Sequence, residues 1–262
     1  MAAAPLPNFL LPVSCLALAM PRMLGCALVL PALGRQHMAG LERSAFCLAL
    51  SLPQAQLLWP LLQHQPLTFL QGGALALKEV LLGVLLGCLL AVPFWAMRAA
   101  GTLIDNQRGT NAAQQINPSL QADSSILGEL CERALLVYLI ETGLFLRLFD
   151  VMADSYQLWP ALTLAPLHAP AAHQAMLAAL TRLMADAMLY SAPVLLVTML
   201  AEYVLAIGSS VLQGLDVYQV AMPVKAMLAL WMLMMCFPAL LPFIATHAGE
   251  WWGDAVLQAL CP

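Results

Sequence analysis

Residues 74–97 of the chain read ALALKEVLLGVLLGCLLAVPFWAM. This apolar stretch exceeds the roughly 20 residues that a helix needs to cross a bilayer, although it contains the charged pair Lys78-Glu79. Charged side chains are costly in lipid, so Lys78 and Glu79 mark a face that contacts protein or water. The stretch therefore predicts a membrane helix with one protected side.

The pattern recurs along the chain and predicts an all-α, polytopic membrane protein built as a single domain over residues 1–262. Prolines at positions 12, 21, 60, 238 and 242 predict kinks or broken helices, because proline removes a backbone hydrogen bond and clashes with the preceding turn. The six apolar stretches of about bilayer length are residues 9–33, 45–62, 74–97, 130–149, 187–207 and 224–246.

Composition supports the membrane assignment and excludes several functions. Apolar residues make up 62% of the chain and charged residues only 9%, against roughly 25% charged residues in a soluble domain. Mean hydropathy is +0.84, the net charge is −4, and no run of Lys or Arg occurs. A nucleic-acid surface and a polybasic lipid-binding patch are both excluded on these grounds.

The charged residues within or beside the apolar stretches separate into paired and unpaired groups. Helical spacing predicts three ion pairs, Glu129 with Arg133, Arg182 with Asp186, and Arg147 with Asp150. Glu141 and Glu202 have no such partner. A small secondary transporter or ion channel that uses these two acids as carriers is the main alternative function, although no inverted repeat supports it.

No pattern of a catalytic or cofactor site occurs in the sequence. The motifs GxSxG, HExxH and the phosphate-binding P-loop are absent, and His168 and His173 flank Pro170 at a spacing that does not suit a metal. We therefore expect no enzymatic activity, no cofactor and no metal, and an intramembrane enzyme ranks third among the functions considered.

The longest polar segment runs from Arg98 to Glu129 and contains the stretches AGTLIDNQRGT, residues 100–110, and INPSL, residues 116–120. Glycine and proline in it favour turns, Asp105 and Arg108 are spaced to pair, and its amides offer hydrogen bonds without net charge. Non-helical backbone at membrane depth is tolerated where it lines a water-filled cavity. We expect a channel-lining or plug loop, with the candidate residues Gly101, Asp105, Gln107, Arg108, Gly109, Asn111, Gln114, Gln115, Asn117 and Pro118.

At this segment the chain resembles the T component of the type III secretion export apparatus, a family related to the flagellar export protein FliR. The resemblance rests on Gly101, Ile104-Asp105, Gln107-Arg108-Gly109 and Asn117-Pro118, then on Asp154-Ser155-Tyr156 with Leu158-Trp159-Pro160, and on Met222-Pro223-Val224-Lys225. One loop departs from the pattern. Ser210, Gln213-Gly214 and Asp216 stand where relatives commonly carry an Arg, a Pro-Gln pair and an Asn, whereas Val217-Tyr218 keep the expected character.

The resemblance implies a non-enzymatic subunit of the export gate in the bacterial inner membrane, within the base of a virulence secretion system. It implies assembly with R and S subunits into a closed helical channel for unfolded secreted proteins, with the U autoprotease subunit alongside and with membrane lipid around the assembly. Residues 106–121 then help to plug the channel, and Asp216, Tyr218, Pro223 and Lys225 are candidate contacts to other subunits. The polar segment is thus singled out both by its residues and by the resemblance.

Overall fold

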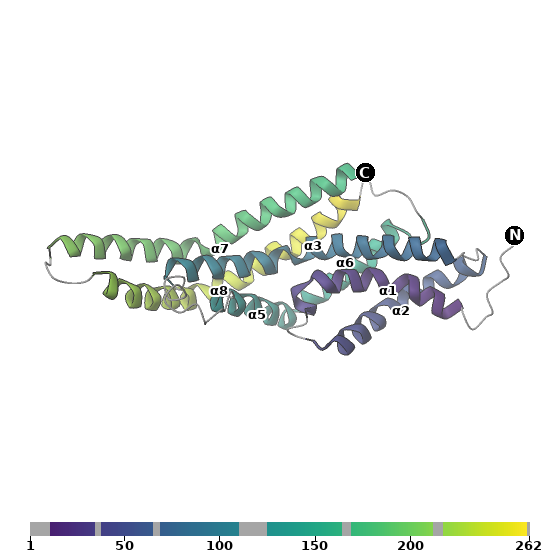
Figure 1. Cartoon of the computed structure of the whole chain (residues 1–262), viewed down its shortest axis with the longest axis horizontal. Coiled ribbons are helices and arrows are strands. Elements are labelled where there is room, and N and C mark those ends of the chain that lie inside the picture. The colour runs from purple at the N-terminus through teal and green to yellow at the C-terminus, as the bar shows by residue number, and fades with distance from the viewer. Residues whose placement is uncertain are drawn as a thin grey trace. The chain divides into compact units, whose positions relative to one another are not determined.

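The computed structural model describes residues 11–34, 38–64, 69–109, 125–163, 169–211 and 217–260, and helices account for nearly all of them. No strand occurs within these ranges, which confirms the all-α prediction (Figure 1). The helices are α1 (Leu11–Val29), the short 3-10 helix η1 (Pro31–Leu33), α2 (Gly40–His64), α3 (Phe69–Gln107), α5 (Ile126–Glu141), α6 (Phe145–Leu158), α7 (Ala169–Val211) and α8 (Val217–Leu260).

Five of the described helices are long and apolar enough to cross a membrane, which confirms the polytopic assignment. The candidate spans are Leu11–Val29, Gly40–Gln63, Leu70–Gln107, His173–Gly208 and Ala221–Gly253. The predicted fourth stretch, residues 130–149, is wrong as a single span, because the chain divides it between α5 and α6.

The division lies at Gly143, whose φ of 74° places it in the left-handed region that L side chains rarely adopt. Thr142 caps α5 by donating its backbone N–H to the carbonyl of Tyr138. The 16 residues of α5 and the 14 of α6 extend about 24 and 21 Å, short of a hydrocarbon core of about 30 Å. Apolar composition alone did not reveal this turn.

Of the kinks or breaks predicted at the prolines, breaks do not occur at those inside α1, α2 and α8. α1 continues through Pro21, α2 through Pro53 and Pro60, and α8 through Pro238 and Pro242. The boundary at Arg98 was wrong as well, because α3 remains helical to Gln107. The polar side chains that were assigned to a loop lie instead on the last turns of α3, where they contact α5.

The described chain divides into two compact units. The first unit comprises Met1–Val92, Gly143–Ala179 and Gly249–Pro262, and the second comprises Pro93–Thr142 and Leu180–Ala248. Helices α3, α7 and α8 each continue without a break from one unit into the other. Each unit is thus assembled from separated segments, and the single domain over residues 1–262 stays a prediction.

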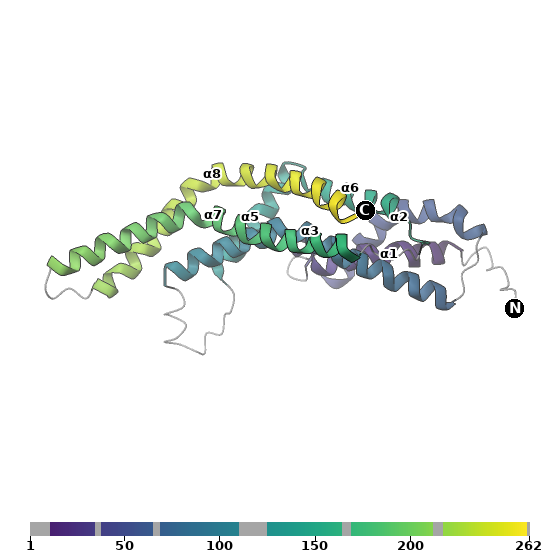
Figure 2. The same cartoon turned by 90° about the horizontal axis from the view of Figure 1, so that it is seen from above.

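In the first unit, α1 and α2 lie side by side (Figures 1 and 2), and a buried arginine joins α1 to α3 and α6. Arg22 is 0% exposed, and its Nε donates to Glu79 Oε2 of α3 at 2.6 Å. Its Nη1 donates to Ser155 Oγ at 3.1 Å, and its Nη2 to the carbonyl of Trp159 at 2.9 Å. A guanidinium group in apolar surroundings requires such partners, because an unpaired buried charge is strongly destabilising.

Tyr156 completes this arginine site from α6. The Arg22 Cζ lies 3.9 Å from the centre of the Tyr156 ring, in the geometry of a cation–π contact. Burial raises the pKa of Tyr156, although the Arg22 cation lowers it, so the phenol stays protonated. Its O–H donates to the carbonyl of Ala19 at 2.6 Å, which ties α6 to α1 a second time.

Lys78 lies beside the other oxygen of Glu79 and holds the turn that follows α6. Its Nζ lies 2.8 Å from Glu79 Oε1. The same ammonium donates to the carbonyls of Pro160, Ala161 and Thr163 at 3.2, 3.1 and 2.9 Å. We refer to Arg22, Lys78, Glu79, Ser155, Tyr156 and the carbonyls of residues 159, 160, 161 and 163 as the buried ion network.

Glycines bring the backbones of α1 and α3 into direct contact beside this network. A Cβ on Gly83 would overlap the carbonyl oxygen of Arg22, and one on Gly25 would lie 2.5 Å from that of Val80. Gly87 is similarly close to Cys26, at 3.0 Å. Gly83 and Gly87 are four residues apart, the spacing that lets two membrane helices approach closely. The ion network therefore sits where the helices cannot be moved apart without losing both sets of contacts.

Replacing Gly83 by Ala should separate α1 from α3, because the added methyl group would occupy the space of a backbone carbonyl. We expect a loss of about 2 kcal/mol or more, in the range of overpacked sites, measured by thermal unfolding in mild detergent. Gly72→Ala is the matched control, because nothing lies within 4 Å of the place that its added methyl group would take. Equal unfolding temperatures for the two variants would contradict the close contact.

Replacing Glu79 by Gln should leave the Arg22 cation buried without its counter-charge. Removing one partner of a buried pair costs about 3–5 kcal/mol, so we expect poor accumulation of the variant and a lower unfolding temperature. Glu129→Gln alters a more exposed ion pair, with Arg133, and should change stability by about 1 kcal/mol or less. Similar losses in both variants would show that burial does not govern the Glu79 pair.

Candidate functional site

In the second unit, α3 and α5 pack through a pair of glycines. A Cβ on Gly101 would lie 2.7 Å from the Cα of Gly128, and one on Gly128 would lie 2.8 Å from Thr102 Oγ1. Gly101 was expected to shape a loop, and this placement was wrong. It lies inside α3, where its missing side chain allows α5 to approach.

Asp105 attaches the start of α5 to the end of α3. Its Oδ2 accepts hydrogen bonds from Ser125 Oγ at 2.5 Å and from the backbone N–H of Leu127 at 3.0 Å. Ser125 is the N-cap residue of α5 and accepts from the N–H of Gly128. A carboxylate at a helix N-terminus satisfies free backbone donors and is favoured by the helix dipole. Arg98 of α3 and Glu132 of α5 form a further ion pair at 3.2 Å.

Arg108 extends this arrangement beyond the last turn of α3. Its Nη2 lies 2.6 Å from Asp105 Oδ1, which confirms the predicted pair. The next residue, Gly109, has a φ of 91°, and its Cα hydrogen faces the side chain of Met222, since a Cβ there would lie 3.1 Å from Met222 Cε. Only glycine adopts this backbone freely, so the turn after Arg108 depends on Gly109.

A further ion pair of the second unit joins α7 to α8, which run antiparallel in both views (Figures 1 and 2). Lys225 Nζ lies 2.8 Å from Glu202 Oε1, with the lysine side chain 13% exposed and the glutamate 54% exposed. Glu202 is therefore paired, contrary to the reasoning that made it a candidate carrier.

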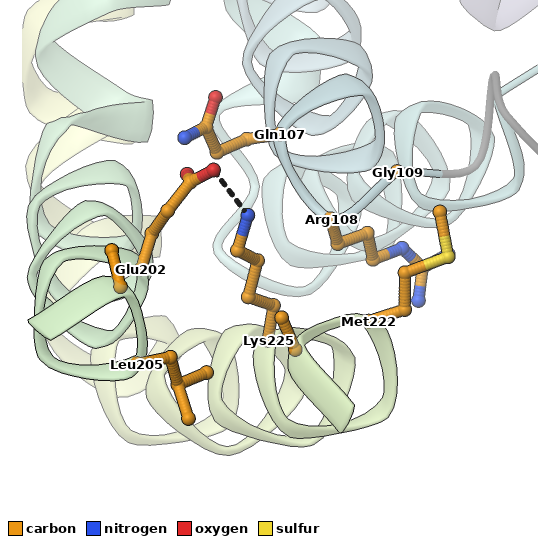
Figure 3. A pocket seen from close by; sticks show the side chains of 9 residues that line it. Gln107, Arg108, Gly109, Glu202, Leu205, Met222 and Lys225 are labelled. Atoms are coloured by element: carbon orange, nitrogen blue, oxygen red, sulfur yellow. Dashed lines mark ion pairs between the residues drawn. The ribbon is translucent and has the colours of Figure 1, made fainter. Parts of the chain in front are cut away.

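These elements enclose a hollow of about 360 Å³ in the second unit. Figure 3 shows Lys225 extended toward Glu202, with the Gln107 amide beyond that carboxylate and Arg108 on the side of Met222. The lining is polar around these side chains and apolar where α7 and α8 contribute small and aliphatic residues. It consists of Gln107, Arg108, Gly109, Glu202, Leu205, Ala206, Ala221, Met222 and Lys225.

The structure brings together some of the predicted site residues and separates others. Gln107, Arg108, Gly109 and Lys225 share the hollow, whereas Gly101 and Asp105 hold α3 to α5. Pro223 is exposed on α8. Asn111, Gln114, Gln115, Asn117, Pro118 and Asp216 lie outside the described residues, as does the side chain of Tyr218. The channel and contact roles of all of these residues stay predictions.

Of the three ion pairs predicted among the charges within or beside the apolar stretches, two occur in the structure. Glu129 pairs with Arg133 at 3.1 Å and Arg182 with Asp186 at 3.0 Å. Arg147 and Asp150 form no ion pair with each other, although both belong to the described part of α6. Both side chains are exposed on α6, so neither charge is buried and in need of the other.

Sequence reasoning missed the buried ion network and the role of Met222 beside Gly109. Ser155, Tyr156, Trp159 and Pro160 belonged to the family-like segment, but nothing in their spacing pointed to Arg22 or Lys78. Arg22 lies inside the first apolar stretch, and no role was predicted for it. An arginine within an apolar stretch requires polar partners, and Glu79, an acid within another apolar stretch, could have been proposed as one of them.

Residues 13–250 match the family model described as "Bacterial export proteins, family 1". The chain is 32% identical over 216 residues, 81% of each chain, to Yop proteins translocation protein T of Yersinia pestis. It is 28% identical over 245 residues, 90% of each chain, to Surface presentation of antigens protein SpaR of Salmonella typhimurium. Identity to Flagellar biosynthetic protein FliR of Caulobacter vibrioides is 23% over 217 residues, 83% of this chain and 86% of that one. The chain belongs to this family, that of the type III export apparatus T component and FliR.

Exchanging the charges of Lys225 and Glu202 tests whether their contact shapes the hollow. Lys225→Glu places two carboxylates together and should lower stability by about 1 kcal/mol, a modest loss because Glu202 is half exposed. The double variant Lys225→Glu/Glu202→Lys should recover most of it, measured by thermal unfolding in mild detergent. Additive losses in the double variant would show that the two side chains do not interact.

Proposed function

We propose that the chain is a non-enzymatic subunit of the export gate in the bacterial inner membrane, where it forms a protein-conducting channel with R and S subunits. Unfolded proteins destined for secretion are its cargo, and the U subunit is its further partner. The polar hollow of the second unit and the segment 106–121 belong to the part of the subunit that controls passage.

The observation that carries this proposal is the convergence of two distant segments on one hollow. Gln107-Arg108-Gly109 and Met222 with Lys225 were singled out independently, by polarity and by resemblance, and more than a hundred residues separate them. In the structure they line the same space. Polar groups are costly in an apolar chain, so a cluster of them from three helices indicates a role beyond packing.

The surfaces of α7 and α8 agree with a subunit embedded in lipid and in other subunits. Only 17% of the candidate span in each of these two helices is buried, compared with 67% for α3. Large apolar side chains at helical spacing cover both, among them Leu196, Met199, Leu200, Tyr203, Ile207, Met227, Trp231, Met234 and Met235. Such faces require an apolar environment.

A secondary transporter or channel for small ions is supported less well. Its carriers would have been Glu141 and Glu202, but Glu202 is bound to Lys225, and Glu141 is exposed at the last residue of α5. The two acids therefore do not form the line of unpaired carboxylates that a relay requires. The names of the relatives, translocation protein and flagellar biosynthetic protein, favour polypeptide export instead.

Gly109→Val should disturb the hollow, because a branched side chain is strained at a φ of 91° and would meet Met222. In cells that depend on this chain, we expect a several-fold drop in secreted type III substrates or a leak of small solutes through the resting channel. Gly143→Val is the control, since its φ of 74° imposes similar strain in open space. Normal secretion and a tight resting channel in the Gly109 variant would contradict the role of the hollow.

The partner assignment is tested by purifying the chain in mild detergent and measuring the mass of what accompanies it. Discrete complexes with two other small membrane proteins are expected. A stable, monodisperse monomer that moves an ion or small solute across vesicles would establish the transporter instead.

A further inference from the structure

Two consecutive tryptophans near the end of α8 contact the backbone of α3 just before a proline. Pro93 has no N–H, so the carbonyl of Leu89, four residues earlier, loses its helical donor. Trp251 Nε1 donates to this carbonyl at 2.8 Å. Trp252 Nε1 donates to the next carbonyl, that of Leu90, at 3.1 Å. The two tryptophans and the two leucines all belong to the first unit.

Five other prolines inside helices of the described residues are treated differently. Pro21, Pro53, Pro60, Pro193 and Pro238 also deprive a carbonyl of its donor. Among the hydrogen bonds of the described residues, none from a side chain reaches those carbonyls, which belong to Ala17, Ala49, Gln56, Leu189 and Met234. The bond from Trp251 is therefore specific to Pro93 rather than a general response to proline.

Burial explains why this carbonyl requires a donor. Leu89, Leu90 and Trp252 are each 0% exposed. A buried acceptor without a hydrogen bond costs about 1–3 kcal/mol, and an indole offers one N–H on a large apolar body that suits such surroundings. The second bond, to Leu90, adds a donor to a carbonyl that can still accept from the helix, since carbonyl oxygen has two lone pairs.

Pro93 is also the point at which α3 leaves the first unit. Before it, α3 is held by Glu79 and by the glycine contact at Gly83. After it, α3 is held by Gly101 and Asp105 and ends in Gln107-Arg108-Gly109 at the hollow. Helices bend most readily at proline, so the bonds to Leu89 and Leu90 hold the backbone of α3 where it is weakest.

We propose that Trp251 and Trp252 form a hydrogen-bond latch that restrains the backbone of α3 at Pro93, and that export requires this restraint. The latch replaces the missing proline N–H with a donor from another helix, which satisfies the buried carbonyl of Leu89. The export part of the proposal rests on the proposed function, whereas the latch itself is independent of it.

A double-mutant cycle with Pro93→Ala tests the latch. Trp251→Phe keeps an aromatic ring but removes the N–H, and should speed amide hydrogen exchange in residues 93–100 about three- to tenfold, as expected for one lost hydrogen bond. In the Pro93→Ala background, the new N–H of residue 93 can bond the Leu89 carbonyl, so the same substitution should change exchange little. The measurement uses full-length protein purified with its partner subunits.

Trp231→Phe is the control, because Trp231 is exposed on α8. It should leave exchange in residues 93–100 unchanged in both backgrounds. An equal effect of Trp251→Phe with and without Pro93 would show that the ring acts through packing alone, and the latch would be wrong.

Secretion provides the second measurement. Trp251→Phe/Trp252→Phe should reduce export or cause a resting leak, and adding Pro93→Ala should restore much of the loss from position 251. Faster exchange with unchanged export and leak would show that export does not require the latch. If the wild-type complex neither exports nor conducts polypeptide, the proposed function fails, and the exchange cycle still decides the latch.

Discussion

The first unit depends on the burial of one cation, the guanidinium group of Arg22. Placed within an apolar helix and fully enclosed, it must find acceptors that no neighbouring turn of α1 supplies. Glu79, Ser155 and the Trp159 carbonyl provide them from α3 and from the end of α6. Because these acceptors are fixed in direction as well as distance, the arginine sets the register of three helices, which apolar contacts alone leave loosely determined.

Glycine contacts also hold helices together, once in each of the two units. Gly25 and Gly83 bring α1 against α3 in the first unit, and Gly101 and Gly128 bring α3 against α5 in the second. In each case a polar contact lies beside the glycines, Arg22 with Glu79 or Arg98 with Glu132. Close backbone approach and charge pairing thus occur together in this member of the export protein family, and α3 takes part in both.

Contacts between residues close together in the sequence could be predicted, whereas contacts between residues far apart could not. Pairs three or four residues apart, such as Asp105 with Arg108 and Arg182 with Asp186, followed from helical geometry. Arg22 with Glu79 and Trp251 with Leu89 are separated by 57 and 162 residues, and no local pattern signals them. The same limit explains the errors at α5 and α6, where a left-handed glycine divides an apolar run, and at Arg98–Gln107, where polar groups serve helix packing. The sequence singled out the two segments that line the hollow, but it did not predict that they lie together, because this depends on the packing of α7 against α8.

The ammonium of Lys78 has a coordination that resembles a bound monovalent cation, with three carbonyl oxygens from a single turn and one carboxylate oxygen around it. Converging carbonyls of this kind attract potassium or sodium when no side chain occupies them. Here the cation is covalently part of the chain, so it cannot dissociate when the salt on either side of the membrane changes. The turn after α6 is consequently held by a cation whose occupancy does not depend on the ion concentration on either side of the membrane.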